Sequence, residues 1–77
     1  MITVLLFAHL RDQVGERELK LQLPSMPVAD FKQFMKTEYN LSDIDSIMIA
    51  INEEFAESDE MIADGDTVAL IPPVSGG

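Results

Sequence analysis

A chain of 77 residues, 47% of them hydrophobic, has room for one small domain with a modest core. Fourteen acidic against five basic side chains give a formal charge of −9, which disfavours nucleic acid and anionic membranes as partners and favours a basic protein surface. The absence of cysteine excludes disulfides, thiolate metal sites and a cysteine nucleophile within this sequence.

The remaining compositional features indicate where the protein works. No apolar run approaches the roughly 20 residues of a membrane span, and the amino terminus lacks the cationic start of a signal peptide. We therefore expect a cytoplasmic protein that contacts no membrane. The single histidine, His9, cannot form a multi-histidine metal site, so we expect a structural role for it and no metal site.

The first third of the chain predicts two strands. Residues 2–10 begin as a strongly apolar strand with apolar side chains on both faces, which is typical of a central strand or of a partner site. Residues 11–15 predict a connection or a single helical turn, with Gly15 free to adopt a positive φ. Residues 18–23 alternate leucine with polar side chains, as expected for a half-buried strand antiparallel to the first.

A helix is predicted from residue 28 to residue 39. Residues 24–27 include two prolines, which should break the sheet and open the helix. Asp30 suits the positive amino end of this helix, and Asn40 favours a left-handed termination. The apolar stripe at helical spacing is expected to pack in the core rather than to bind a cofactor; it consists of Val28, Phe31, Phe34 or Met35, and Tyr39.

The second half of the chain predicts shorter elements. Residues 41–46 are expected to form a polar loop or a short turn, followed by a third strand over residues 47–51. A short edge segment follows at residues 55–56. The Asp-Gly-Asp sequence at residues 64–66 predicts a tight turn that leads into a last strand over residues 67–71.

This order of elements predicts an α+β fold with a mixed sheet and one main helix packed across one face. A single helix cannot cover both faces, so a second apolar set remains for the outer face: Leu5, Phe7, Met48, Ala50, Ala69 and Ile71. A contiguous patch of this kind often marks a protein interface, although a slightly apolar surface on a small domain is the alternative.

The sequence contains no catalytic set of side chains, no phosphate-binding loop and no complete calcium-binding loop. Seven of the fourteen acidic residues lie between Glu53 and Asp66. Paired carboxylates can act as acid and base, but a charge run in a turn-rich segment is more often a solvated surface. We therefore expect this segment to be solvated or to dock a basic partner.

The carboxyl-terminal segment holds the one reactive group that the sequence offers. Pro72 and Pro73 should end sheet pairing and favour an extended exit. The four residues after them, Val74, Ser75, Gly76 and Gly77, reach at most about 14 Å. Because glycine has no Cβ, Gly76 and Gly77 could pass through a narrow slot and place the terminal carboxylate in a partner's active site. The alternative is a frayed end. We expect residues 1–73 to form the domain and residues 74–77 a flexible tail.

Three stretches carry a resemblance to a known family over the whole chain. They are Val4-Leu5-Leu6-Phe7-Ala8 with Leu10-Arg11-Asp12 and Gly15, then Ala50-Ile51-Asn52-Glu53-Glu54-Phe55, then Asp64-Gly65-Asp66-Thr67-Val68-Ala69-Leu70-Ile71-Pro72-Pro73-Val74-Ser75-Gly76-Gly77. The chain resembles the small subunits of molybdopterin synthase, which are sulfur carriers with the ubiquitin-like β-grasp fold. Thiamine-pathway carriers also end in glycines but typically lack the Pro-Pro-Val lead-in, so they are the nearer rival.

The resemblance implies a chemistry carried by the chain end. An E1-like adenylyltransferase would use ATP to adenylate the carboxylate of Gly77, and the acyl-adenylate would become a thiocarboxylate. The tail would then enter the large subunit of the synthase and pass its sulfur to cyclic pyranopterin monophosphate. Two small and two large subunits would form a heterotetramer. The catalytic side chains would belong to the large subunit, so this chain would hold no cofactor and would not be an enzyme on its own.

The resemblance also implies partner-binding residues. Phe7, Phe55 and Ile71 match apolar interface positions, and Ile71 stands where some relatives have an aromatic residue. Arg11 would touch the partner or form a local salt bridge. The tail residues Pro72, Pro73, Val74, Ser75 and Gly76 would line the path into the large subunit. Two other classes remain open: a ubiquitin-like modifier that forms isopeptide bonds through Gly77, and a binding module whose tail is irrelevant.

Overall fold

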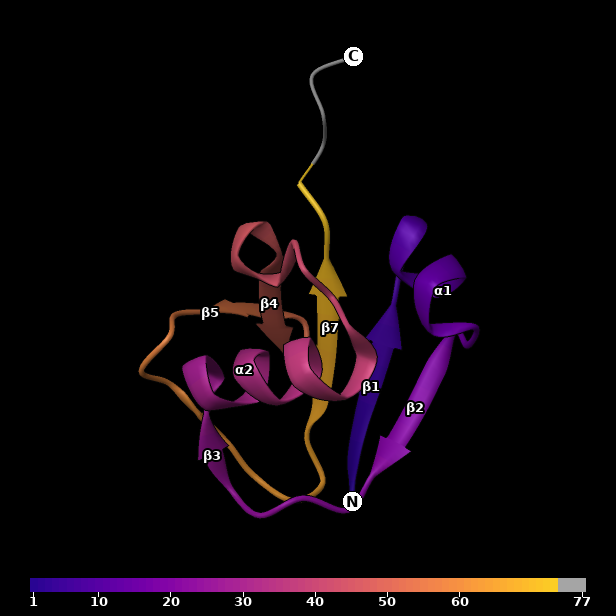
Figure 1. The fold of residues 1–77 in the computed structure, drawn as a ribbon. Helices are drawn as coiled ribbons and strands as arrows, with labels where there is room; N and C mark the ends of the chain where they lie inside the picture. Colours follow the sequence, from indigo (N-terminus) through magenta and orange to yellow (C-terminus); the bar gives the residue numbers. More distant parts are fainter. Residues whose placement is uncertain (74–77) are drawn as a thin grey trace.

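The computed structural model describes residues 1–73, and its main layer is a mixed five-stranded sheet in the order β2-β1-β7-β4-β5 (Figure 1). The strands are β1 (Ile2–Leu6), β2 (Glu18–Leu21), β4 (Met48–Ile51), β5 (Glu54–Ala56) and β7 (Thr67–Ile71). The central strands β1 and β7 are parallel, whereas the outer pairs are antiparallel. Because parallel strands end at the same edge of a sheet, the carboxyl ends of β1 and β7 lie side by side.

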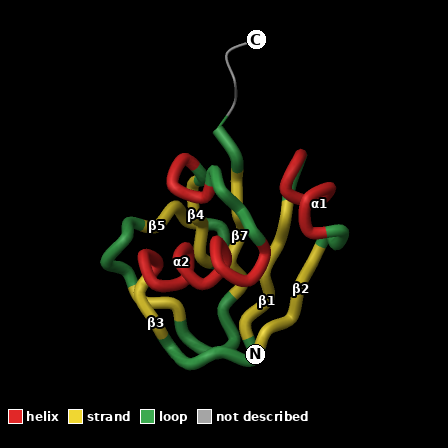
Figure 2. The backbone as a smooth tube through the Cα atoms, in the orientation of Figure 1, coloured by secondary structure: helices red, strands yellow, loops and turns green. Residues whose placement is uncertain are grey.

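The second layer is the helix α2 (Val28–Tyr39), which crosses one face of the sheet (Figure 2). Alternate side chains of β1 and β7 point toward this helix, as the period of two in a strand requires. The fully buried side chains include Ile2, Val4, Leu10, Phe31, Met35, Leu41, Ile62, Val68 and Leu70. The α+β architecture predicted from the order of elements is therefore confirmed.

The boundaries of α2 agree with the sequence prediction. Pro27 precedes the helix with φ −65° and ψ 156°, so its missing N–H removes no helical hydrogen bond. Asn40 ends the helix in the left-handed conformation, with φ 55° and ψ 40°. On the apolar stripe, Met35 is fully buried, whereas Phe34 is only partly buried against the core.

The predicted first strand is too long. β1 ends at Leu6, Ala8 adopts a positive φ of 53°, and residues His9–Val14 form the helix α1. Leu10 faces the core from this helix and is fully buried. The apolar run was assigned to a strand because a short run of this kind fits a buried strand or one turn of helix equally well. The predicted positive φ of Gly15 is confirmed at 86°.

The predictions for two short segments had different outcomes, and the first was wrong. The residues predicted to break the sheet contain β3 (Met26–Pro27), which pairs antiparallel with β6 (Met61–Ile62) in a separate two-stranded sheet. Pro27 has no backbone N–H to donate, but the β3–β6 ladder is only two residues long and needs few hydrogen-bond donors from β3. The prediction of a polar loop or a short turn at residues 41–46 is met by the single-turn 3₁₀ helix η1 (Ile44–Ser46). Its apolar side chain Ile44 is buried in the core.

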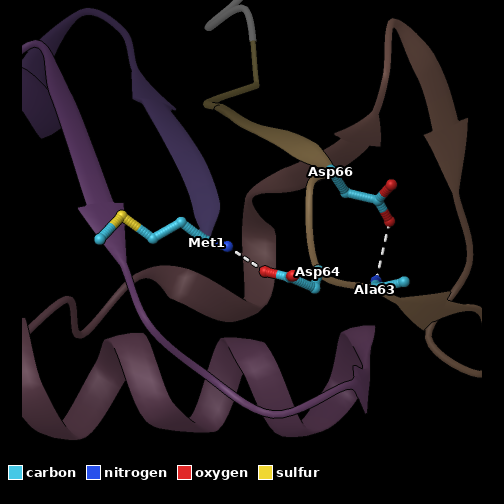
Figure 3. Close-up of polar contacts among 4 residues, drawn as sticks. All are labelled: Met1, Ala63, Asp64 and Asp66. Atoms are coloured by element: carbon cyan, nitrogen blue, oxygen red, sulfur yellow. Dashed lines mark hydrogen bonds and ion pairs between the residues drawn. The ribbon is translucent and has the colours of Figure 1, made fainter.

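The predicted turn at residues 64–66 joins the amino end of β1 to the start of β7 (Figure 3). The α-amino group of Met1 forms an ion pair with the carboxylate of Asp64. Gly65, with φ 91°, donates its N–H to the Met1 carbonyl at 2.9 Å. A carboxylate oxygen of Asp66 accepts the Ala63 N–H at 2.8 Å. These contacts hold the two central strands together at the edge opposite their carboxyl ends.

The Met1–Asp64 contact predicts a pH dependence of stability. The hydrogen bond from the Met1 amino group, and then its positive charge, hold the pKa of Asp64 below the ordinary value of 3.8. A depressed folded-state pKa stabilises the fold above the unfolded-state pKa, and this contribution is lost as the pH falls through the lower folded-state value. Asp64→Asn should therefore lower the melting temperature at neutral pH, and the difference from the wild type should shrink below about pH 4.

Thermal melts of both chains across this pH range test the contact. Asp59→Asn, on another exposed acidic residue of the same segment, is the matched control and should follow the wild-type curve. A gap between wild type and Asp64→Asn that persists undiminished at low pH would contradict the assignment.

Candidate functional site

The face of the sheet that α2 leaves uncovered contains an apolar hollow of about 570 Å³. We call its apolar lining the apolar sheet face: Leu5, Phe7, Ala50, Phe55, Ala69 and Ile71. Asn52, Glu53 and Thr67 complete the rim. Two aromatic side chains stand out from it, since Phe7 is 46% and Phe55 64% exposed. This surface therefore combines large exposed aromatic side chains with a concave floor.

The register of the sheet explains the hollow. Four side chains of the face form one row across β1, β7, β4 and β5, in the order Leu5, Ala69, Ala50 and Phe55. The two central members are alanines and the two outer members are large. A row with small residues in the middle and large residues at the ends leaves a depression over the centre of the sheet.

The predicted outer set agrees with this lining, with one exception. Leu5, Phe7, Ala50, Ala69 and Ile71 all line the hollow. Met48 pairs with Ile71 in register but does not line it, and instead lies in a neighbouring groove with Lys32 and Phe55. Met48 is the first residue of β4, so it lies at the end of this strand.

The turn between β4 and β5, which the Asn52-Glu53-Glu54 sequence predicts, positions Phe55, but the side-chain contacts of Asn52 were not identified from the sequence. Asn52 and Glu53 both have positive φ, 50° and 73°, as a two-residue hairpin of type I′ requires. The Asn52 side chain accepts the Thr67 N–H and donates to an Asp66 carboxylate oxygen, both at 3.0 Å. The turn is thereby tied to the start of β7. Asparagine tolerates a left-handed turn position, so Asn52 was the available sequence signal for this turn.

The carboxyl-terminal segment leaves the sheet beside this face. Ile71 is the last residue of β7, so the prediction that Pro72 and Pro73 end sheet pairing is confirmed. Pro72 is half-buried and Pro73 is exposed. The remaining predicted residues of the segment, Val74, Ser75, Gly76 and Gly77, lie outside the described residues.

The other candidate residues lie around the two helices. Arg11 is exposed on α1 and lines a groove that also contains Leu5 and Phe7. The His9 Nε2 lies 2.7 Å from a carboxylate oxygen of Asp43, so this histidine joins α1 to the segment before η1. In the part of the chain that the structure describes, no three His, Cys, Asp or Glu side chains cluster as a metal site requires. No helix of residues 1–73 has the length and apolar character to span a membrane.

Comparison with known proteins identifies the family. The model of the ThiS family matches residues 4–77, which is nearly the whole chain. This chain belongs to the ThiS family. Two curated relatives of this chain are named molybdopterin synthase sulfur carrier subunit. The protein of Escherichia coli K12 is 33% identical with all of both chains covered, and that of Drosophila ananassae is 37% identical over 99% of this chain and 90% of its own.

Solved structures show the same fold. A Pyrococcus furiosus chain described as a molybdopterin converting factor, subunit 1, matches with a TM-score of 0.80 at 27% identity, covering 95% of this chain and 97% of its own. SAMP1, a small archaeal modifier protein of Haloferax volcanii, matches with a TM-score of 0.78 at 30% identity, and the match covers 99% of this chain and 98% of SAMP1. A chain from the complex of subunits 1 and 2 of the Helicobacter pylori molybdopterin-converting factor matches with a TM-score of 0.69 at 20% identity, and the match covers 99% of this chain and 97% of that one. At this identity the similarity shows the fold alone. This chain therefore has the ubiquitin-like β-grasp fold.

The tie between the β4–β5 turn and β7 can be tested by stability. Asn52→Ala removes a hydrogen bond from the Thr67 N–H and one to the Asp66 carboxylate, and it places alanine at a φ of 50°, so it should lower the free energy of unfolding by about 1–3 kcal/mol. Asn52→Gly removes the same hydrogen bonds but accepts the positive φ, and should cost less. Urea denaturation measures both variants. Equal losses would assign the effect to the hydrogen bonds alone.

Proposed function

We propose that this chain is the sulfur-carrier subunit of a molybdopterin synthase and that the carboxylate of Gly77 carries the sulfur. The observation that supports this most directly is the end-to-end match with curated sulfur carrier subunits of that synthase, at 33% identity over all of the bacterial relative. The apolar sheet face beside the end of β7 adds a surface on which a partner can dock while it receives the tail. The absence of cysteine leaves the chain end to carry the sulfur.

The proposed chemistry proceeds in three steps. The Gly77 carboxylate attacks the α-phosphate of ATP on an E1-like activating enzyme, which forms the acyl-adenylate and releases pyrophosphate. A sulfur donor displaces AMP and leaves a thiocarboxylate. This sulfur bonds to cyclic pyranopterin monophosphate in the large subunit, and water then hydrolyses the acyl–sulfur bond, so that the sulfur stays on the acceptor and the carrier returns as the carboxylate. Two sulfurs are needed for each dithiolene, so two carrier cycles complete one product.

The proposed assembly follows from the same scheme. Two small and two large subunits form the heterotetramer, and the large subunit supplies the catalytic side chains, so the small subunit holds no cofactor of its own. Phe7, Phe55 and Ile71 contact the large subunit; a phenylalanine moved from water into such a contact contributes up to about 3 kcal/mol. Activation consumes ATP, which supports a cytoplasmic location.

A second function, protein modification, is supported by one specific observation. The similarity to SAMP1 of Haloferax volcanii, at 30% identity over nearly the whole of both chains, is as extensive as the similarity to the curated sulfur carriers. A modifier would use the same acyl-adenylate but would transfer Gly77 to a lysine as an isopeptide. A thiamine-type sulfur carrier is the alternative within the carrier class.

Intact mass of the chain purified from its own cells tests the proposal. The carrier function predicts a mass gain equal to the replacement of one oxygen by one sulfur, and this gain should be absent when Gly77 is deleted. Deletion should also abolish sulfur transfer while leaving the thermal melt unchanged. Lysine-linked adducts that depend on ATP, without the sulfur-bearing species, would assign the chain to the modifiers instead.

Charge on the apolar sheet face should prevent assembly with the large subunit. Phe55→Asp should weaken binding by at least about 100-fold, because the complex would bury an unpaired carboxylate at a cost of several kcal/mol. Phe55 is 64% exposed, so the isolated chain should fold normally. Met61→Asp is the matched control, since Met61 is 56% exposed but lies on β6, outside the face. Titration calorimetry that finds equal affinities for both variants would place the interface elsewhere.

A further inference from the structure

Two arginine side chains line one groove at the end of the apolar sheet face next to β2. Arg11 on α1 and Arg17, one residue before β2, line this groove together with Leu5, Leu6, Phe7 and Glu18. We call it the arginine groove. Leu5 and Phe7 belong to both the groove and the apolar sheet face, so the two surfaces are continuous. Arg11 and Arg17 also line a second hollow beside Gly15.

The backbone fixes the positions from which both arginines extend. The N–H of Gly15 donates to the Arg11 carbonyl at 2.7 Å, and the left-handed φ of Gly15 turns the chain back toward the sheet. The N–H of Leu6 then donates to the Arg17 carbonyl at 2.9 Å. The two arginines therefore stand on the two sides of one tight connection, beside the end of β1.

Neither guanidinium is neutralised by an ion pair within the described residues. The ion pairs of residues 1–73 are Met1–Asp64 and His9–Asp43. Arg11 and Arg17 are both exposed and have no carboxylate oxygen within 4.0 Å in that part of the chain. A guanidinium offers a planar set of donors that suits a carboxylate, so two of them beside an apolar contact surface form a receptor for an acidic side chain.

The distribution of charge along the face agrees with this reading. Glu53, Glu54 and Glu57 lie in or next to β5, at the end of the sheet opposite β2, and residues 53–66 hold no basic side chain. Residues 11–20, at the β2 end, hold three basic and three acidic side chains and are neutral in sum. In a chain of formal charge −9, the arginine groove is thus a region where an incoming carboxylate meets less repulsion than at the β5 end.

We propose that Arg17, together with Arg11, receives a carboxylate of the protein that covers the apolar sheet face, and that this contact sets the orientation of docking. The inference rests on the proposed function, because it takes the large subunit of the synthase as the protein that covers the face. It adds Arg17, and the acidic chemistry of the partner group, to the apolar contacts.

Charge reversal at Arg17 tests the inference. Arg17→Glu should weaken binding to the large subunit at least tenfold, and raising the salt concentration should reduce the difference from the wild type. Lys36→Glu is the matched control: it changes the net charge equally but lies exposed on α2, which covers the opposite face. Equal weakening by both variants would assign the effect to net charge and overturn the inference.

Substitution of Glu18 tests the sign of the partner group. Glu18 lines the same groove and repels an incoming carboxylate, so Glu18→Gln should strengthen binding. Weakening by Glu18→Gln would indicate a cationic partner group and overturn the inference. If Arg17→Glu binds the large subunit normally while inorganic phosphate shifts the amide resonances of residues 11–17, the groove binds small anions and the inference is likewise overturned.

The outcome for the wild-type chain separates this inference from the proposed function. If the wild type binds the large subunit and Phe55→Asp does not, the proposed function stands, and a normal affinity of Arg17→Glu then overturns the arginine groove alone. If the wild type neither binds the large subunit nor acquires sulfur at Gly77, the proposed function fails, and the inference fails with it.

Discussion

The parallel pairing of β1 with β7 is the constraint on which the rest of the structure depends. It joins the first strand of the chain to the last, with Thr3 facing Thr67 and Leu6 facing Leu70. The Asp64–Asp66 turn closes this pair at one edge, where Thr3 donates its N–H to the Asp66 carbonyl at 3.0 Å. Because the strands are parallel, their carboxyl ends meet at the other edge. Phe7 and the exit of the carboxyl-terminal segment are therefore neighbours as a result of topology.

The exposed apolar face follows from the small size of the chain. One helix of twelve residues covers one face of the sheet, and the chain has no second helix long enough to cover the other among residues 1–73. The inner face is filled by large aliphatic side chains, whereas the row across the outer face has Ala69 and Ala50 at its centre. Filling that centre would need no new element, only larger side chains. Its small residues instead leave room for side chains of a partner.

Local signals predicted the elements with clear ends, and long-range pairing determined the rest. Proline before α2 and Asn40 after it mark the helix, and Asp64-Gly65-Asp66 marks the start of β7. The run after Leu6 had no such marker, since one buried leucine fits a strand or a helix. β3 was missed because its pairing with β6 depends on contacts across the fold. The apolar set of the outer face was predictable from period-two alternation, but the role of Asn52 and the meeting of Arg11 with Arg17 required the folded chain.

Apolar contact and charge have different parts in such an interface. Burial of Phe7 and Phe55 supplies free energy but no direction, since hydrophobic attraction is nearly independent of orientation. Under the proposed function, the tail enters a partner's active site, which would need a defined orientation as well as affinity. Acidic side chains lie at the β5 end of the face, and at its β2 end lie two guanidinium groups that form no ion pair within residues 1–73. A partner with basic groups opposite the β5 end and acidic groups opposite the β2 end would dock in one orientation. In the reversed orientation like charges would meet and repel.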